Sequence, residues 1–207
     1  MTAGFPPEPD PEVAAVVLAA GQSVRMGRPK LLLVWQGKSL LRRAVEAAVA
    51  ACRRVVVVVG PDPQRMGEEL SSLPVVVVVN PDYAEGIATS LRRGVQAVGD
   101  APAALVVLAD QPAVTAEHLR RLVQAYRKSG APLAAAAYGD TVGAPAVFSQ
   151  KLFPELLALE GDTGAKRVVE RHRHEAVVVP VPGAALDVDT PEDWERLCAP
   201  GADTAAG

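Results

Sequence analysis

The amino-acid sequence predicts an α/β fold in which helices cover both faces of a mostly parallel sheet. Several short segments are apolar throughout, which is typical of strands that are buried on both faces. The segments between them place apolar residues at helical spacing. Strands that alternate with helices build parallel sheets, and ligands bind beyond the carboxyl ends of such strands. The residues that directly follow each strand are therefore the first candidates for a functional site.

The strands and helices can be placed from these patterns. Helical spacing is clearest in residues 40–49 and 119–126. We expect strands at five apolar runs, residues 13–19, 55–59, 75–79, 104–109 and 133–137.

The pattern loosens after Gly139. A segment punctuated by glycine and proline runs to Phe148, and short helices are expected near residues 151–159 and 164–171. Strand-like segments follow at residues 176–181 and 186–188, and then a final helix. We expect this half to be an insertion that holds a second substrate beside the sheet.

Composition restricts the class of protein. A chain of 207 residues with 49% hydrophobic and 22% charged residues is typical of one globular domain, here residues 13–197, with flexible tails at 1–12 and 198–207. The formal net charge of -3 and the absence of a Lys/Arg run argue against nucleic acid or an anionic membrane as partner. Two cysteines are too few for a disulfide framework, and no signal peptide or membrane span is apparent. The sequence therefore predicts a cytoplasmic protein with a small-molecule partner.

The loop after the first predicted strand, LAAGQSVRMGRPK at residues 18–30, suits phosphate groups. Glycines allow backbone N–H groups to approach a polyphosphate, and Arg25 and Lys30 add positive charge. The spacing of Gly21, Gly27 and Lys30 does not match the Walker loop, and no G-x-G-x-x-G is present. Composition alone leaves an ordinary turn with solvated basic residues equally possible.

Three carboxylates are candidate metal ligands. Asp110 directly follows the fourth predicted strand, where a hard cation beside a phosphate loop would be held. Asp187 and Asp189 alternate, which would place both carboxylates on one face of a short strand. The alternatives are a turn-forming aspartate and a solvent-facing edge strand. Residues 190–193 are explained by helix initiation, so we assign them no catalytic role.

Two polar, glycine-punctuated stretches, residues 80–90 and 160–166, each precede a predicted helix. The simplest interpretation is that Thr89 or Ser90, and Asp162 or Thr163, are helix N-caps. The three histidines show no metal-ligand spacing and are interpreted as surface residues.

Taken together, these segments resemble the MobA-like nucleotidyltransferases, and most closely the molybdenum cofactor cytidylyltransferases. The resemblance covers residues 13–197 and rests on five motifs in order. They are the 18–30 loop, Asn80/Gly86/Ser90 in N-x5-G-x3-S spacing, Asp110-Gln111-Pro112, Gly161-Asp162-x-Gly164-Ala165 and Asp187-x-Asp189-Thr190-Pro191-Glu192-Asp193. Any one of them is weak, but a chance match of all five in order is implausible.

The resemblance implies a Rossmann-like three-layer α/β/α nucleotidyltransferase domain that moves CMP from CTP onto molybdenum-loaded molybdopterin and releases pyrophosphate. It implies catalytic roles for Arg25, Lys30 and Asp110, and a Mg²⁺ ion at Asp110, Asp187 and Asp189. The implied acceptor-binding residues are Gly161, Asp162, Gly164 and Lys166. The implied nucleotide-binding residues are Leu18, Ala19, Ala20, Gly21, Ser23, Arg25, Gly27, Lys30, Asn80, Gly86 and Ser90.

Some alternatives stay open. The cytidylyltransferases tend to have Gly-His-Pro where this chain has Gly143-Ala144-Pro145, which leaves the acceptor open. A guanylyltransferase or another NTP-dependent transferase would share the loop and the aspartates. A non-catalytic nucleotide-binding accessory protein of a molybdoenzyme client is a third possibility, and retention of Lys30 and all three aspartates argues against it.

Overall fold

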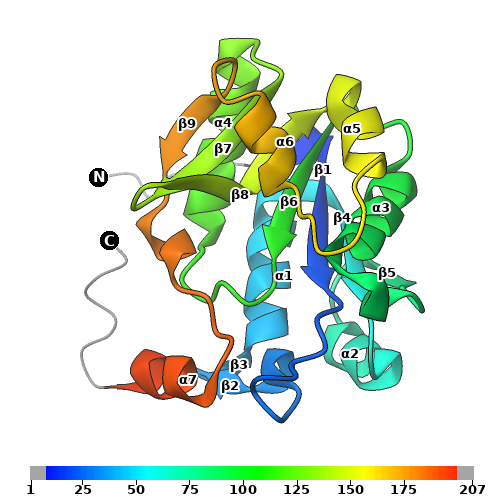
Figure 1. The fold of residues 1–207 in the computed structure, drawn as a ribbon, viewed down its shortest axis with the longest axis vertical. Helices are drawn as coiled ribbons and strands as arrows, with labels where there is room; N and C mark the ends of the chain where they lie inside the picture. The colour runs from blue at the N-terminus through cyan, green and yellow to red at the C-terminus, as the bar shows by residue number, and fades with distance from the viewer. Residues whose placement is uncertain (1–7, 200–207) are drawn as a thin grey trace.

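The computed structural model describes residues 8–199, and a seven-stranded sheet runs through them (Figure 1). The strand order is β5-β4-β1-β6-β8-β7-β9, and every strand is parallel to its neighbours except β8, which is antiparallel to both β6 and β7. The seven strands are β1 (Asp10–Ala19), β4 (Cys52–Val59), β5 (Val76–Val79), β6 (Ala103–Leu108), β7 (Leu133–Tyr138), β8 (Thr141–Ser149) and β9 (Val177–Pro180). This confirms the predicted α/β fold with a mostly parallel sheet.

Helices cover the sheet on both faces, which gives the three predicted layers. On one face lie α1 (Leu40–Ala51), α2 (Pro63–Leu70) and α4 (Ala116–Ser129), whose apolar side chains join one core cluster. On the other face lie α3 (Ile87–Val98), α5 (Phe153–Leu157) and α6 (Lys166–Arg171), which contribute to a second cluster. Helix α3 packs against β1 so closely that a Cβ atom at Gly94 would lie 2.2 Å from Val16 Cγ1. The first strand is thus held between two apolar cores, with its carboxyl end free to carry the following loop.

A third, smaller cluster lies beyond the carboxyl ends of the strands. It joins the hairpin β2 (Val34–Trp35) and β3 (Lys38–Ser39) to the last helix, α7 (Pro191–Cys198). Met26, Val188 and Leu197 are buried in it, with Trp35 and Trp194 packed against them. Figure 1 shows α7 and the hairpin side by side below the sheet. The cluster fastens the loop after β1 to α7, the last helix of the described residues.

The structure corrects several expectations for the second half of the chain. Residues 141–149 form strand β8 inside the sheet, so this half is part of the sheet and the expected insertion is wrong. Residues 186–188 do not form a strand; they are irregular, because Val188 turns into the small cluster below the sheet and has no neighbouring strand to pair with.

The expected tails differ from the structure at both ends. Strand β1 already begins at Asp10, because the Asp10 carboxylate accepts hydrogen bonds from the amides of Glu12 and Val13 and pairs with Arg127. Cys198 is the last residue of α7. The remaining tail residues, 1–7 and 200–207, lie outside the described part of the chain. Within residues 8–199, no helix has the length and apolar character that a membrane span requires.

Candidate active site

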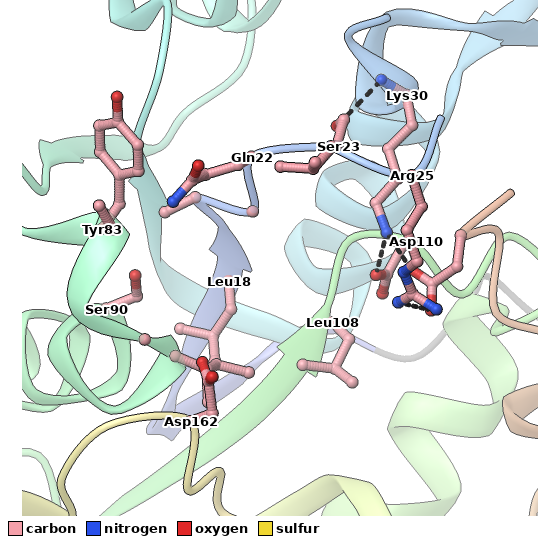
Figure 2. Close-up of a pocket in the computed structure, with 17 residues that line it drawn as sticks. Leu18, Gln22, Ser23, Arg25, Lys30, Tyr83, Ser90, Leu108, Asp110 and Asp162 are labelled. Carbon is pink, nitrogen blue, oxygen red and sulfur yellow. Dashed lines mark hydrogen bonds and ion pairs between the residues drawn. The ribbon is translucent and has the colours of Figure 1, made fainter. Parts of the chain in front are cut away.

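A cavity of about 550 Å³ opens at the carboxyl ends of β1 and β6. Figure 2 shows Arg25, Lys30 and Asp110 gathered on one side of it, with Tyr83, Ser90 and Asp162 on the opposite side and the side chains of Leu18 and Leu108 between them. The residues that line it are Leu18, Ala20, Gly21, Gln22, Ser23, Val24, Arg25, Lys30, Tyr83, Ala84, Gly86, Ile87, Ser90, Leu108, Asp110, Asp162 and Asp189.

The loop after β1 forms one wall of the cavity. Its backbone turns sharply at Ser23, whose φ of 55° is left-handed and whose carbonyl oxygen accepts hydrogen bonds from the amides of Met26 and Gly27. Ser23 Oγ also accepts from the Lys30 amide at 3.2 Å, which closes the loop. Met26 is buried in the small cluster below the sheet. The polar backbone of the loop is therefore held in one conformation beside the cavity.

Lys30 lies between two of the candidate metal ligands. Its Nζ donates to Asp110 Oδ2 at 2.8 Å and to Asp189 Oδ1 at 2.7 Å, and its side chain is 8% exposed. Arg25 Nη2 donates to Asp189 Oδ2 at 2.7 Å. Two cations and two carboxylates from three distant parts of the sequence thus share one corner of the cavity.

The charges of this corner shift the pKa values of its groups. Burial lowers the pKa of the Lys30 ammonium, but Asp110 and Asp189 more than offset this, and the net pKa lies above its ordinary value. Burial likewise raises the pKa of Asp189, and the hydrogen bonds and charges of Lys30 and Arg25 bring it below its ordinary value. Both shifts favour the charged forms of Lys30 and Asp189, which stabilise each other.

Asp187 lies beside this corner but does not line the cavity. The residue as a whole is exposed, yet its carboxyl is still desolvated by neighbouring atoms. This desolvation, together with the negative charge of Asp110, raises its pKa to about 6. A cation bound near Asp187 would favour its charged form and offset the repulsion from Asp110.

Gln111 contributes to the arrangement, and we assigned it no role from the sequence. It is 2% exposed, and its Nε2 donates to the Ala184 carbonyl at 2.9 Å. The Val188 amide donates to the Asp110 carbonyl at 3.0 Å. A Cβ atom at Gly183 would lie 2.4 Å from the Ala113 carbonyl oxygen, so the two segments are in direct contact. These contacts join residues 110–113 to residues 183–188 and bring the late aspartates next to Asp110.

The donor atoms of this corner fit a divalent metal such as Mg²⁺. Hard cations prefer carboxylate oxygens, and Mg²⁺ usually takes one or two carboxylates, several waters and the phosphates of a substrate. Asp110 and Asp189 already direct one oxygen each at a single cation, the Lys30 ammonium. In the described part of the chain no three acidic, histidine or cysteine side chains are arranged as a complete metal cage. The arrangement that fits is a metal ion held jointly by two carboxylates and by the phosphates of a bound substrate.

The opposite wall combines the two glycine-punctuated stretches. At Gly86, φ is 114° and a Cβ atom would lie 2.3 Å from the Gly161 carbonyl group, so only glycine fits there. The Ala88 amide donates to the same Gly161 carbonyl. This contact brings Asp162 to the edge of the cavity, opposite Lys30.

Asn80 organises this wall from beneath. It is fully buried, and its Nδ2 donates to the hydroxyls of Thr89 and Ser90 at 2.9 Å each. Its Oδ1 accepts from the Asp82 amide and from Arg93 Nε. All four hydrogen bonds of the amide are therefore used within the protein, and Asn80 supports the wall without lining the cavity.

The N-cap interpretation of these stretches is wrong. Helix α3 begins at Ile87 after the N-cap Gly86, and Thr89 Oγ1 donates back to the Gly86 or Asp82 carbonyl. Helix α6 has Ala165 as N-cap, with no side-chain cap.

The remaining predicted residues do not line the cavity. Ala19 is buried in the core, and Gly27 forms the outer turn of the loop with a φ of 67°. Gly164 lies against Ile87, and the Lys166 side chain runs along Gly143. Conversely, Gln22, Tyr83 and Leu108 line the cavity although the resemblance assigned them no role. Gln22 and Tyr83 lie inside the motif segments that the sequence singled out, whereas Leu108 was only part of a predicted strand.

Comparison with known proteins identifies the family. Residues 15–177 match the model of the MobA-like NTP transferase domain. The chain belongs to this family. It is 33% identical over 198 residues to the nicotine blue oxidoreductase of Paenarthrobacter nicotinovorans, covering 90% of this chain and 97% of that protein. It is 26% identical over 183 residues to the molybdenum cofactor cytidylyltransferase of Escherichia coli, covering 88% and 93%.

Solved structures agree with this family assignment. The crystal structure of Rv0371c from Mycobacterium tuberculosis is 32% identical, with a TM-score of 0.80 over 91% of this chain and 98% of that one. A second structure of Rv0371c is a complex with manganese, with 30% identity and a TM-score of 0.76 over 90% and 98% of the chains. The predicted nucleotidyltransferase fold and family are thus confirmed.

Proposed function

We propose that this protein transfers CMP from CTP to a molybdopterin-type acceptor, with release of pyrophosphate. The observation that carries the proposal is the corner in which Lys30 and Arg25 share Asp110 and Asp189 at the mouth of the cavity. A polyphosphate with its metal brings the complementary charges, because phosphate oxygens pair with the cations and the metal pairs with the carboxylates. The similarity to the cytidylyltransferase of Escherichia coli supports the same choice of substrates.

The chemistry is an in-line displacement at the α-phosphorus. A terminal phosphate oxygen of the acceptor forms the new P–O bond, and the bond to the β-phosphate oxygen breaks as pyrophosphate leaves. The attacking phosphate is already an anion, so no strong general base is required. Lys30 and Arg25 would align the triphosphate and neutralise its charge, which is how phosphoryl and nucleotidyl transfers are mainly catalysed.

Asp110 and Asp189 would hold Mg²⁺, with Asp187 beside them. When bound, Mg²⁺ stabilises the charge that develops on the α-phosphoryl oxygens and on the leaving group. Because Lys30 now occupies the space between the two carboxylates, loading the site requires its ammonium to move toward the triphosphate. Lys30 and the metal would thus neutralise the same aspartates in turn. Asp162 and Lys166 lie on the side of α6, where the acceptor would approach.

Ala20 is the residue that favours CTP over GTP. It lines the cavity, and its carbonyl oxygen and side chain lie directly against Gly60, where an added Cβ would be 2.7 Å from the Ala20 oxygen. The turn therefore has little freedom to widen for a purine. One methyl group in a pocket is worth about 1–3 kcal/mol, so the preference is clear without being absolute.

The test compares kcat/KM for CTP and GTP with one molybdopterin acceptor, in the wild type and in Ala20→Gly. We expect CTP to be preferred and the variant to narrow the difference without inverting it. Equal or better use of GTP by the wild type would overturn the cytidylyl assignment in favour of guanylyl transfer. A protein that binds CTP but never releases pyrophosphate, with any acceptor, would be an accessory nucleotide-binding protein.

A redox activity is the second candidate, because the nicotine blue oxidoreductase is the more identical of the two relatives, at 33% against 26%. Pyrophosphate release separates the two. Reduction of a pigment such as nicotine blue consumes a hydride donor and requires no NTP, whereas nucleotidyl transfer requires one. Turnover of the pigment that is unaffected by Asp110→Asn and by removal of Mg²⁺ would favour the redox activity.

A further inference from the structure

Asp193, in the first turn of α7, contacts the chain segment that carries a candidate metal ligand. Its Oδ2 accepts hydrogen bonds from the Asp189 amide at 3.1 Å and from the Thr190 amide at 2.9 Å. We propose that Asp193 is a positioning residue, which fixes the backbone of Asp189 so that its carboxylate points to Asp110 and Lys30. The inference rests on the proposed function, since it concerns the same carboxylate.

Asp189 needs such a support because it lies in an irregular segment with no neighbouring strand. Two backbone contacts define its place. On one side, the Val188 amide donates to the Asp110 carbonyl at 3.0 Å. On the other side, the Asp189 amide donates to Asp193. Loss of the second contact would leave the backbone at Asp189 held on one side only, so its carboxylate would be less firmly placed.

Helix α7 is well placed to serve as the support. Leu197 is buried in the small cluster together with Val188 and with Met26 of the phosphate loop. Arg196 Nη2 donates to Asp193 Oδ1, which leaves Oδ2 for the two amides.

The contact to Asp189 lies outside the ordinary capping box of the helix. In that box, Thr190 Oγ1 accepts from the Asp193 amide and the Asp193 carboxylate accepts from the Thr190 amide. Thr190→Ala removes the threonine half of the box but leaves the Asp189 amide bonded to Asp193. Asp193→Ala removes the box and the contact to Asp189 together. The two variants therefore separate stabilisation of the helix from positioning of the metal ligand.

The test measures Mn²⁺ binding to the full chain with CTP present, by electron paramagnetic resonance, in the wild type, Asp193→Ala, Asp193→Asn and Thr190→Ala. Loss of a supporting hydrogen bond to a metal ligand typically costs ten- to a hundredfold in metal affinity. We expect the Mn²⁺ dissociation constant to rise about tenfold in Asp193→Ala, as that rule implies. Thr190→Ala should lower the unfolding midpoint about as much as Asp193→Ala does, because both variants damage the helix cap. Its Mn²⁺ dissociation constant should nevertheless remain within about twofold of the wild-type value, since the Asp189 amide stays bonded to Asp193. Asp193→Asn keeps an acceptor oxygen and should restore most of the affinity.

A second readout follows the contact itself. The Asp189 amide should exchange its proton faster in Asp193→Ala than in Thr190→Ala, as measured by NMR under conditions where both variants are folded. Equal Mn²⁺ dissociation constants in Asp193→Ala and Thr190→Ala would overturn the proposal, and so would an asparagine variant as impaired as the alanine variant. If the wild type binds Mn²⁺ and CTP but transfers no CMP, the proposed function fails while the comparison of these variants still decides the role of Asp193.

Discussion

Replacement of Lys30 by methionine tests the claim that this lysine stands where a metal ion would stand. The substitution keeps most of the apolar stem and removes the ammonium that bridges Asp110 Oδ2 and Asp189 Oδ1. Hydrogen bonds to charged groups contribute about 1.5–3 kcal/mol each, and a buried charge left without its partner costs more. Asp110 and Asp189 keep side-chain exposures of 26% and 33%, and Arg25 remains on Asp189, so the loss is at the lower end of that sum. We expect Lys30→Met to lower the unfolding free energy by about 3 kcal/mol in EDTA.

Added Mg²⁺ should reverse part of this loss. The variant presents the same carboxylates without a competing ammonium, so it should bind the ion more tightly than the wild type does without nucleotide. A ligand at a hundred times its dissociation constant stabilises the folded state by about 2.7 kcal/mol. Urea denaturation at pH 7.5 measures both effects when it is run in EDTA and in 10 mM MgCl₂, which is about a hundred times a dissociation constant of 0.1 mM.

A matched control uses a second lysine. Lys38 pairs with Glu46 at the surface, where its side chain is 50% exposed. Exposed pairs contribute about 0–1 kcal/mol, so Lys38→Met should change stability little and should not respond to Mg²⁺. If Lys30→Met matches Lys38→Met in both buffers, the exchange of lysine for metal at these carboxylates is refuted.

Three further variants test other parts of the account. Gly86→Ala should lower the unfolding midpoint and weaken NTP binding, because an added methyl would lie 2.3 Å from the backbone of the neighbouring loop at a φ of 114°; a variant with wild-type stability by calorimetry would contradict the close contact. His172→Ala should cost about 0.5–1 kcal/mol at pH 6 and little at pH 9 in urea titrations. Hydrogen bonds to Glu175 and Glu155 raise the pKa of His172, so its contribution is complete below its ordinary pKa and is lost as pH rises through the raised one, and a loss independent of pH would exclude this pairing. Asp110→Asn should fold normally and lose nearly all transfer activity, because a carboxylate at the cavity contributes much to metal binding and little to the stability of the core. A folded variant with normal turnover would show that Asp110 is not part of the site.

The sheet could be predicted from the sequence where its strands form uninterrupted apolar runs; one of these, β5, is an exposed edge strand and not the buried strand that its run predicted. The apolar run at 55–59 marks the buried end of β4, whereas Arg53 and Arg54 at its exposed beginning gave no strand signal. Strand β8 was missed because Gly143 and Pro145 interrupt the pattern that marks the other strands. Its antiparallel pairing with β6 and β7 depends on contacts that no local pattern reports.

Individual residues of the site could be predicted from the sequence, but the ion pairs between them could not. The position of Asp110 after a buried strand, beside the glycine-rich loop that carries Lys30, predicted that these two would lie near each other, whereas a shared site with Asp189 was implied only by the family resemblance. The ion pairs among them depend on distances in space, and the sequence suggested only contacts to phosphate and metal. Gln111 and Asp193 carry no signal of their own, because a buried amide and an acidic residue in a first helical turn both have ordinary structural explanations.

The most direct test of the account is the release of pyrophosphate by the purified protein in the presence of CTP, Mg²⁺ and molybdenum-loaded molybdopterin, with mass spectrometry of the pterin product. The account predicts one pyrophosphate per CMP joined to the acceptor, with no release when the acceptor or Mg²⁺ is omitted and very little from Asp110→Asn. An unmodified pterin and no pyrophosphate, from folded protein that binds CTP, would contradict it.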